Sequence, residues 1–244
     1  MPRGPRVLSE SGYVHVYSRG NAKQILFEQR SDYIFYLNQL RRFSSEMNVA
    51  VCAFCLMENH VHLLVYDKEQ NISGFMGKLN VTYSGYFNHK YGRTGHLFEG
   101  RFKSNPIESE EYLLKAFRYI LNNPRQAGIC QPEDYPWSSY SRYGFSNSFV
   151  DTSVFVELIG DAEKYKVFIA AEYEDCPELE NAVRNDEWAK SVIRDCLHIE
   201  RCTQLQEYDW KSRNEALRLL KMKGLSIRQI ERLTGINHSV IQRA

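Results

Sequence analysis

The sequence predicts an α+β protein: a ferredoxin-like antiparallel sheet with helices, followed by an all-α C-terminal region with a helix-turn-helix. The first observation behind this prediction is the hydrophobic periodicity of residues 13–126, which switches between strand and helix in the order β-α-β-β-α-β-α. That order is the split βαβ plan of ferredoxin-like domains with one helix added. The second observation is that residues 212–244 show only helical periodicity, in three stretches separated by tight turns.

The first four elements are expected before residue 70. Residues 13–19 alternate in polarity and predict a strand. Residues 31–47 carry apolar side chains at positions 34, 37, 40 and 43, a helical spacing, with Ser31 as the expected N-cap. The apolar run 49–57 and the alternating run 60–66 predict two strands joined by a tight turn at Glu58 and Asn59, and therefore a hairpin.

The next three elements complete the predicted domain. Residues 71–91 place their large apolar side chains on one side and predict a second helix, and residues 102–107 predict a fourth strand. A third helix is expected to begin after Ser109, because two glutamates follow in its first turn, and to end at Pro124. Residues 132–150 are expected to wrap this domain as a loop.

Composition excludes several classes of protein. The chain has 244 residues, of which 43% are hydrophobic and 25% charged, as in soluble globular proteins. It has no apolar run of about 18 residues that would predict a membrane-spanning helix, and no apolar segment near the N-terminus that would predict a signal peptide. We therefore expect a cytoplasmic protein without a membrane partner, whose six cysteines are free thiols.

Charge is distributed unevenly and suggests three parts. Residues 1–150 hold 17 Lys and Arg against 13 Asp and Glu, residues 151–200 hold 5 against 13, and residues 201–244 hold 9 against 4. This pattern favours two units that face nucleic acid and are joined by an acidic connector. We predict a first domain at residues 1–150, an acidic helical connector at 151–205 and a DNA-binding region at 206–244.

The most informative short motif is His60-Val61-His62, on a predicted strand. The two-residue period of a strand places both imidazoles on one face, where they can bind a divalent metal, while Val61 faces helices on the other side. The pair Cys52 and Cys55 also lies on a predicted strand, but its odd spacing predicts opposite faces and argues against a shared metal.

The third predicted helix carries side chains that complement the two imidazoles. Tyr119 and Asn123 are four residues apart and share a helix face that is rotated away from the apolar face. An asparagine oxygen can bind a metal, and a tyrosine hydroxyl can attack phosphorus when a metal polarises the phosphate. Tyr112, seven residues earlier, lies near the same face and is the alternative nucleophile.

The last twenty residues have the pattern of a helix-turn-helix. Ser226 and Gln229 form a possible capping box, and Ile227, Ile230 and Leu233 give the first helix an apolar face. Residues 234–236 are the expected turn, and Asn237 would cap the second helix. His238, Ser239, Gln242 and Arg243 could then reach bases or phosphates, although a generic helical hairpin would have the same pattern.

Several motifs together resemble one family. Met57-Glu-Asn-His-Val-His-Leu-Leu-Val65 resembles the HUH motif (His, hydrophobic residue, His) of single-tyrosine transposases. Four further blocks resemble the same family: Ser18-Arg-Gly-Asn21, Gly92-Arg-Thr-Gly-His-Leu-Phe-Glu-Gly-Arg-Phe-Lys-Ser104, Tyr119-Ile-Leu-Asn-Asn-Pro-Arg-Gln-Ala-Gly128 and Tyr135-Pro-Trp-Ser-Ser139. They follow the family's order over roughly residues 5–145 and resemble the REP-associated tyrosine transposases, which are linked to repetitive extragenic palindromes.

The resemblance implies an enzyme that cleaves and rejoins single-stranded DNA near hairpins. Tyr119 would be the nucleophile that forms a 5′-phosphotyrosine link, and His60, His62 and Asn123 would bind Mg²⁺ or Mn²⁺. A monomer and a homodimer are both compatible with the resemblance. The residues expected to contact DNA are Arg19, Arg93, His96, Arg101, Lys103 and Arg125 in the first domain and His238, Ser239, Gln242 and Arg243 near the C-terminus.

Two other functions are compatible with parts of the sequence. A domesticated DNA-binding regulator could keep the transposase fold without catalysis, but the presence of all four candidate catalytic and metal-binding residues argues against it. A nucleotidyl hydrolase of the histidine-triad type also uses His-x-His strands. That enzyme needs a third histidine two residues further on, where this chain has Leu64.

Overall fold

The computed structural model describes residues 8–171, 186–223, 225 and 227–243. The chain divides into two compact units, Met1–Leu179 and Glu180–Ala244, which are treated separately below. Among the described residues, no helix combines the length and the apolar character needed to cross a bilayer.

The first unit is built on a four-stranded antiparallel sheet. Its strands are β1 (Tyr13–Arg19), β2 (Ala50–Met57), β3 (His60–Tyr66) and β4 (Lys103–Ile107), in the spatial order β2-β3-β1-β4. The predicted hairpin is present as β2 and β3, and the α+β class with a ferredoxin-like antiparallel sheet is confirmed. The central strands β1 and β3 are buried except at their two end residues.

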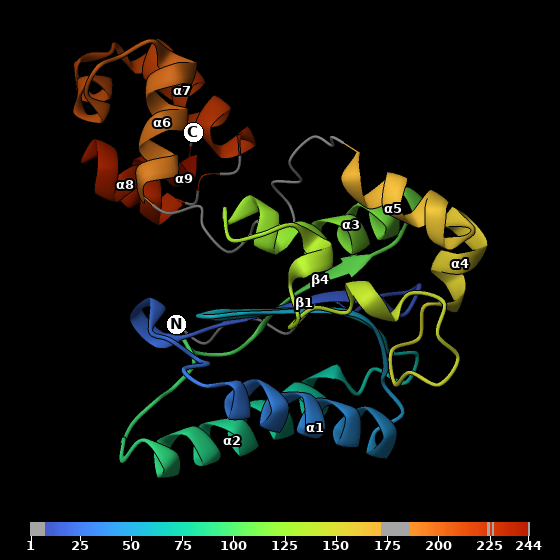
Figure 1. Cartoon of the computed structure of the whole chain (residues 1–244). Helices are drawn as coiled ribbons and strands as arrows, with labels where there is room; N and C mark the ends of the chain where they lie inside the picture. The colour runs from blue at the N-terminus through green and yellow to red at the C-terminus, as the bar shows by residue number, and fades with distance from the viewer. Residues whose placement is uncertain (1–7, 172–185, 224, 226, 244) are drawn as a thin grey trace. The chain divides into compact units, whose positions relative to one another are not determined.

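Helices cover both faces of this sheet (Figure 1). Helices α1 (Arg30–Glu46) and α2 (Ile72–Lys90) lie on one face, and α3 (Glu110–Gln126) lies on the other. Helices α4 (Ser153–Ile159) and α5 (Ala162–Ala170) pack on α3 through Phe155, Tyr165 and Ile169. Short 3-10 helices occur at η1 (Asn21–Lys23), η2 (Pro132–Asp134) and η3 (Tyr140–Arg142).

The segment expected to be a connector is shared between the two units. Helices α4 and α5 belong to the first unit, whereas α6 (Asp186–Leu197) belongs to the second. The functional boundaries at residues 150 and 205 stay a prediction.

The start of α1 differs from the prediction. Ser31 is not the N-cap, because the helix begins at Arg30 and Gln29 takes that position. The side chain of Asp32 decides this start: it accepts hydrogen bonds from the backbone N–H groups of Glu28 and Gln29, at 3.0 and 2.8 Å.

The same buried carboxylate accepts from Lys90 and from two tyrosine hydroxyls of the α2 region, and so ties α1 to α2. Those donors hold the pKa of Asp32 below its ordinary value although burial raises it.

The end of α3 also differs from the prediction. The helix begins after Ser109, whose hydroxyl accepts a hydrogen bond from the Tyr112 N–H, as expected for an N-cap. It continues through Pro124 and ends at Gln126. A proline this close to the end removes a single backbone donor, and the Ala127 N–H still bonds to the Asn123 carbonyl at 2.9 Å.

A bulge in β2 overturns the prediction for Cys52 and Cys55. The register against β3 shifts between Val51 and Ala53, so one extra residue enters the strand at Cys52. Both cysteines therefore face the α3 side and lie in the same hydrophobic cluster. Both are free and buried, and burial raises the pKa of each thiol well above its ordinary value, which disfavours the thiolate that metal binding requires.

Residues 132–150 cover the outer edge of β2, which agrees with the predicted wrapping loop. The Leu56 N–H donates to the Trp137 carbonyl at 2.9 Å, and the Ser139 N–H donates to the Phe54 carbonyl at 3.0 Å. The hydroxyl of Tyr135 donates to the Leu56 carbonyl at 2.7 Å. This segment thus satisfies backbone groups that would otherwise lie at an open sheet edge.

The second unit is entirely helical where the structure describes it. It contains α6, the 3-10 helix η4 (Cys202–Glu207), α7 (Trp210–Met222), α8 (Ile227–Thr234) and α9 (His238–Arg243). Ile230 and Ile241 are fully buried in its core, and Ile227 and Leu233 pack against that core. The three helices predicted for residues 212–244 are present, whereas the capping box proposed for Ser226 lies outside the described residues.

Candidate active site

The register of β1 against β3 assembles the candidate site on the α3 face of the sheet. Arg19 lies opposite His60, and Tyr17 lies opposite His62. Because alternate residues share a face, all four side chains point to the side covered by α3, while Val61 and Leu63 pack toward α1 and α2. The prediction that His60 and His62 share a face is therefore confirmed.

Helix α3 brings Asn123 to His60. The Oδ1 atom of Asn123 lies 3.4 Å from Nε2 of His60, and the Asn123 Nδ2 donates to the Tyr119 carbonyl at 2.9 Å. The Nδ1 atom of His60 lies 2.7 Å from Oδ1 of Asn59. These contacts orient an imidazole nitrogen and an amide oxygen toward each other, as expected for two ligands of one metal ion.

Tyr119 lies beside the histidines. Its ring is edge-on to that of His62, with the centroids 5.5 Å apart, and only 6% of the residue is exposed. The alternative nucleophile, Tyr112, is two helical turns earlier, about 10 Å along the helix axis, beside the Ser109 cap. The structure therefore places Tyr119, one turn from Asn123, at the histidine pair.

Burial keeps the imidazoles neutral near pH 7. Desolvation lowers the pKa of His60 to about 4, and that of His62 falls well below its ordinary value. Neutral imidazoles carry the lone pair that a metal ion requires. The pKa of Tyr17 rises to about 12 through burial, although Arg19, which donates a hydrogen bond to its hydroxyl, opposes the rise.

Two of the basic residues expected to contact DNA lie on the same sheet face as the histidines. Arg19 is opposite His60, and Lys103 of β4 is opposite Tyr17, with its Nζ 5.8 Å from the centroid of the Tyr17 ring. Lys103 is exposed and Arg19 is half-buried. Together they place positive charge on the same sheet face as the predicted nucleophile.

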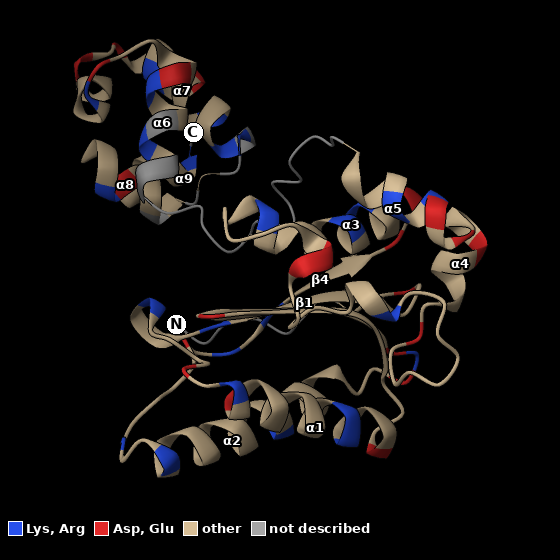
Figure 2. Ribbon diagram, in the orientation of Figure 1, with Lys and Arg blue, Asp and Glu red and all other residues tan. Residues whose placement is uncertain are grey.

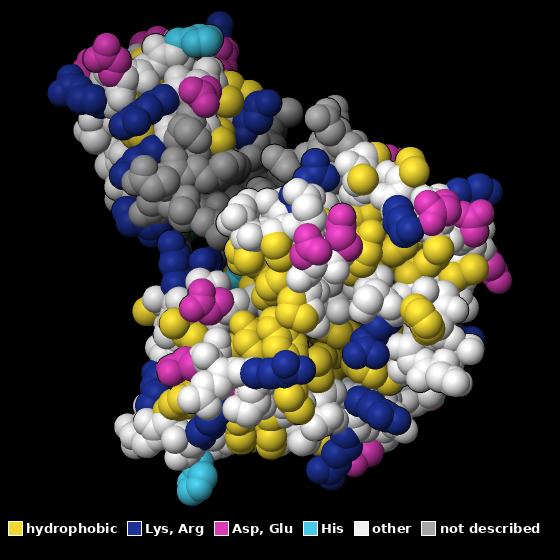
Figure 3. Space-filling view, viewed as in Figure 1, with side chains coloured by type: hydrophobic (Ala, Val, Ile, Leu, Met, Phe, Trp, Pro, Cys, Tyr) yellow, Lys and Arg dark blue, Asp and Glu magenta, His cyan; other side chains and the backbone are white. Residues whose placement is uncertain are grey.

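The remaining predicted contacts of the first unit lie in other places. Arg93 bonds to Gln24 and stacks on the ring of Phe87, which ties it to the loop after β1. Arg125 donates to the Ala170 carbonyl at the end of α5. The side chains of His96 and Arg101 are exposed. On the face that Figure 3 shows, basic side chains are scattered among apolar ones.

Sequence reasoning missed His15 and Tyr17. Both follow the alternation of β1 that includes Arg19, so a period of two could have grouped these three side chains. Placing them beside His62 requires the β1–β3 register, which no local pattern specifies.

The predicted base-contacting residues of the second unit lie on one exposed surface. Asn237 accepts a hydrogen bond from the Ser239 N–H at 2.9 Å and so caps α9. His238, Ser239, Gln242 and Arg243 are exposed, while Ile241 is buried. Lys and Arg occur on each of the helices α6 to α9 (Figure 2).

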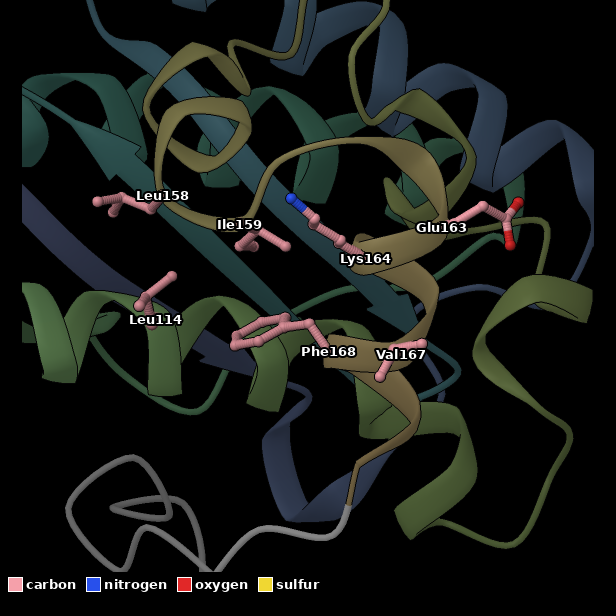
Figure 4. A pocket seen from close by; sticks show the side chains of 7 residues that line it. All are labelled: Leu114, Leu158, Ile159, Glu163, Lys164, Val167 and Phe168. Carbon is pink, nitrogen blue, oxygen red and sulfur yellow. The ribbon is translucent and has the colours of Figure 1, made fainter.

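A separate groove in the first unit has different chemistry. It is open, has a volume of about 520 Å³ and lies between α3, α4 and α5 (Figure 4). Its lining is mostly aliphatic and aromatic, with one glutamate and one lysine: Leu114, Leu158, Ile159, Glu163, Lys164, Val167 and Phe168. No predicted site residue lines it, so it is distinct from the histidine site.

Comparison with protein families finds a similarity within the first unit. Residues 9–123 match the model of the family described as IS200-like transposases. Over this segment the chain is similar to IS200-like transposases. The matched segment runs from the residues just before β1 to Asn123, so it includes His60, His62 and Tyr119.

One solved structure shares the fold. The chain resembles a REP-associated tyrosine transposase bound to a REP hairpin, with 17% identity and a TM-score of 0.50, over 63% of this chain and 96% of that one. A candidate transposase from Deinococcus radiodurans shares 19% identity over 50% of this chain and 97% of that one, but its TM-score of 0.34 is too low to indicate a shared fold. No curated protein matches the chain.

Proposed function

We propose that this protein is a transposase of the IS200-like type: a metal-dependent endonuclease and strand transferase that acts on single-stranded DNA near hairpins. The observation that carries the proposal is the placement of Tyr119 edge-on to His62, one helical turn from the Asn123 side chain that faces His60. A phenol beside two neutral imidazoles and an amide oxygen is the combination that phosphoryl transfer through tyrosine requires.

The chemical step exchanges one phosphodiester for another. The Tyr119 Oη would form a bond to phosphorus while the bond from phosphorus to the 3′ oxygen breaks. The phenol loses its proton to solvent, and the departing oxygen takes one up as a 3′-OH. The 5′-phosphotyrosine link conserves the energy of the broken bond, so a 3′-OH can attack it later and rejoin DNA without ATP.

The donor set fits Mg²⁺ or Mn²⁺. His60 and His62 would supply nitrogen and Asn123 oxygen, and two imidazoles favour Mn²⁺ because Mg²⁺ prefers oxygen ligands. The ion would polarise the scissile phosphate and offset the charge that develops on it. In the part of the chain that the structure describes, no group of three His, Cys, Asp or Glu side chains offers another metal site.

Basic residues would position the DNA. Arg19 and Lys103 could bind phosphates on either side of the scissile bond, with Arg93, His96, Arg101 and Arg125 contacting the hairpin or its flanks. We further propose that α8 and α9 act as a helix-turn-helix, with His238, Ser239, Gln242 and Arg243 contacting DNA. A monomer and a homodimer both remain compatible with this arrangement.

The test looks for a covalent protein–DNA adduct. Labelled single-stranded hairpin oligonucleotides from the DNA flanking the gene would be incubated with the protein and Mn²⁺ or Mg²⁺, then separated under denaturing conditions. We expect an adduct that EDTA prevents and that Tyr119→Phe abolishes, while Tyr112→Phe keeps it. An adduct that survives Tyr119→Phe but is lost in Tyr112→Phe would reassign the nucleophile.

The alternative is a DNA-binding regulator without catalysis. It is favoured by the same exposed basic residues, which would bind a hairpin whether or not the tyrosine reacts. Hairpin binding without an adduct, across both metals and a panel of flanking sequences, would support this alternative.

A further inference from the structure

A third histidine lies against the predicted metal ligands. His15 is 1% exposed, and its Nε2 atom lies 2.9 Å from Nδ1 of His62. The two rings are nearly parallel, with an interplanar angle of 11°. His15 is therefore in direct hydrogen-bond contact with Nδ1 of His62, which leaves Nε2 of His62 as the nitrogen available to a metal.

This contact constrains the tautomer of His62. A neutral imidazole carries its hydrogen on one nitrogen and a lone pair on the other. If His62 donates from Nδ1 to His15, then its Nε2 holds the lone pair that a metal needs. If His15 donates instead, then the hydrogen of His62 sits on Nε2 and blocks metal binding.

The other contacts of His15 indicate a role at the site. Its Nδ1 atom has no hydrogen-bond partner among the described residues, so its contact with His62 is the polar interaction that offsets its burial. An aliphatic side chain at this position would avoid the cost of burying an imidazole. Ligating histidines usually donate their second N–H to an acceptor, which fixes ring orientation and tautomer.

We propose that His15 is a positioning residue for the metal site: its Nε2 accepts the Nδ1–H of His62 and keeps the His62 Nε2 lone pair directed toward the ion. This inference rests on the metal site of the proposed function. It assigns His15 no contact with DNA or with the ion.

The first test measures Mn²⁺ binding by calorimetry, at pH 8 and without DNA. His15→Leu removes the acceptor, and His15→Gln places an amide oxygen near the position of Nε2. We expect affinity to fall about 10–100-fold in His15→Leu and to recover most of that loss in His15→Gln. Val16→Ala is the matched control, because Val16 is the next residue of β1 and packs on the opposite face of the sheet.

The second test reads the tautomer in the wild-type protein and needs no variant to fold. Nitrogen-15 spectra of the histidine rings with saturating Mg²⁺, which is diamagnetic, should show the His62 hydrogen on Nδ1. Finding that hydrogen on Nε2 would overturn the inference, as would a folded His15→Leu variant with wild-type Mn²⁺ affinity.

The two tests separate this inference from the proposed function. If the wild-type protein binds Mn²⁺ more tightly than His15→Leu does but forms no adduct, only the proposed nuclease activity is contradicted. Wild-type protein that binds no Mn²⁺ would overturn the metal site and the role of His15 together.

Discussion

The two faces of the four-stranded sheet are made by alternate residues of the same strands, yet the two central strands give them different chemistry. On the face covered by α1 and α2, β1 and β3 present Val14, Val16, Val61, Leu63 and Val65. The opposite face, under α3, presents His15, Tyr17 and Arg19 from β1 and His60 and His62 from β3. One face is a continuous apolar core, whereas the other combines this polar cluster with a second apolar cluster that includes Leu64, Ile107 and Phe117.

This difference shows how the domain can hold buried histidines and remain folded. Two long helices supply apolar burial on one side, so the other side can hold imidazoles whose desolvation is unfavourable. Changes on the core face should therefore act on stability alone, whereas changes on the α3 face should also act on metal, DNA and chemistry.

The largest expected effect on stability comes from the core face. Leu63→Ala removes a fully buried side chain, and we expect the free energy of unfolding in urea to fall by about 2–5 kcal/mol. The yield of covalent adduct per folded molecule should not change, because Leu63 points away from the histidines. A loss of adduct in protein that is shown to be folded would contradict the separation of the two faces.

The pH dependence of stability should come from the α3 face. Burial lowers the pKa of His15 from 6.5 to about 3, so between these values the unfolded chain binds a proton that the folded chain does not. Stability is then complete above pH 6.5 and is lost as pH falls, by up to ~1.4 kcal/mol per pH unit for one such group. Urea titrations between pH 7.5 and 5 would measure this loss.

His15→Gln makes this prediction specific. In this variant the free energy of unfolding should fall less steeply with decreasing pH, because one group fewer takes up a proton on unfolding. An unchanged slope would mean that His15 is not the neutral, buried group that the structure indicates.

The smallest expected effect concerns DNA affinity. Lys103→Ala should weaken binding of a single-stranded hairpin by about 1 kcal/mol and reduce the slope of log affinity against log salt by about one. The matched control is Arg42→Ala, which removes an exposed cation from α1 on the other side of the sheet. Fluorescence anisotropy would measure the affinity. Equal losses of DNA affinity in the two variants would show that positive charge contributes equally on both sides of the sheet.

Local patterns predicted the elements well where burial repeats in the sequence. The strand 60–66 was predicted with its observed bounds, because its alternation is uninterrupted. The cap of α9 at Asn237 was also predicted, since a cap depends on neighbours two or three residues away. The same locality placed Tyr119 and Asn123 on one face of α3.

Two of the wrong predictions, the cap of α1 and the faces of the two cysteines, have a cause beyond the local sequence. Asp32 displaced Ser31 from the start of α1 because its carboxylate bonds both to the preceding backbone and to side chains of the α2 region. The faces of Cys52 and Cys55 were wrong because a bulge in β2 adds a residue against β3. Neither a network between helices nor a register shift leaves a signal in the periodicity of one segment.

By itself, the sequence determined the order of the elements, the apolar stripes that form the core, and the pairs His60–His62 and Tyr119–Asn123. Each of these depends on side chains within one strand or one helical turn, where backbone geometry sets the spacing. Only the tertiary structure decided that α3 brings Asn123 to His60, that Tyr119 meets His62, and that His15 lies behind His62. Those contacts join residues 47 to 63 positions apart, and strand register and helix packing decide them because both depend on the whole buried surface at once.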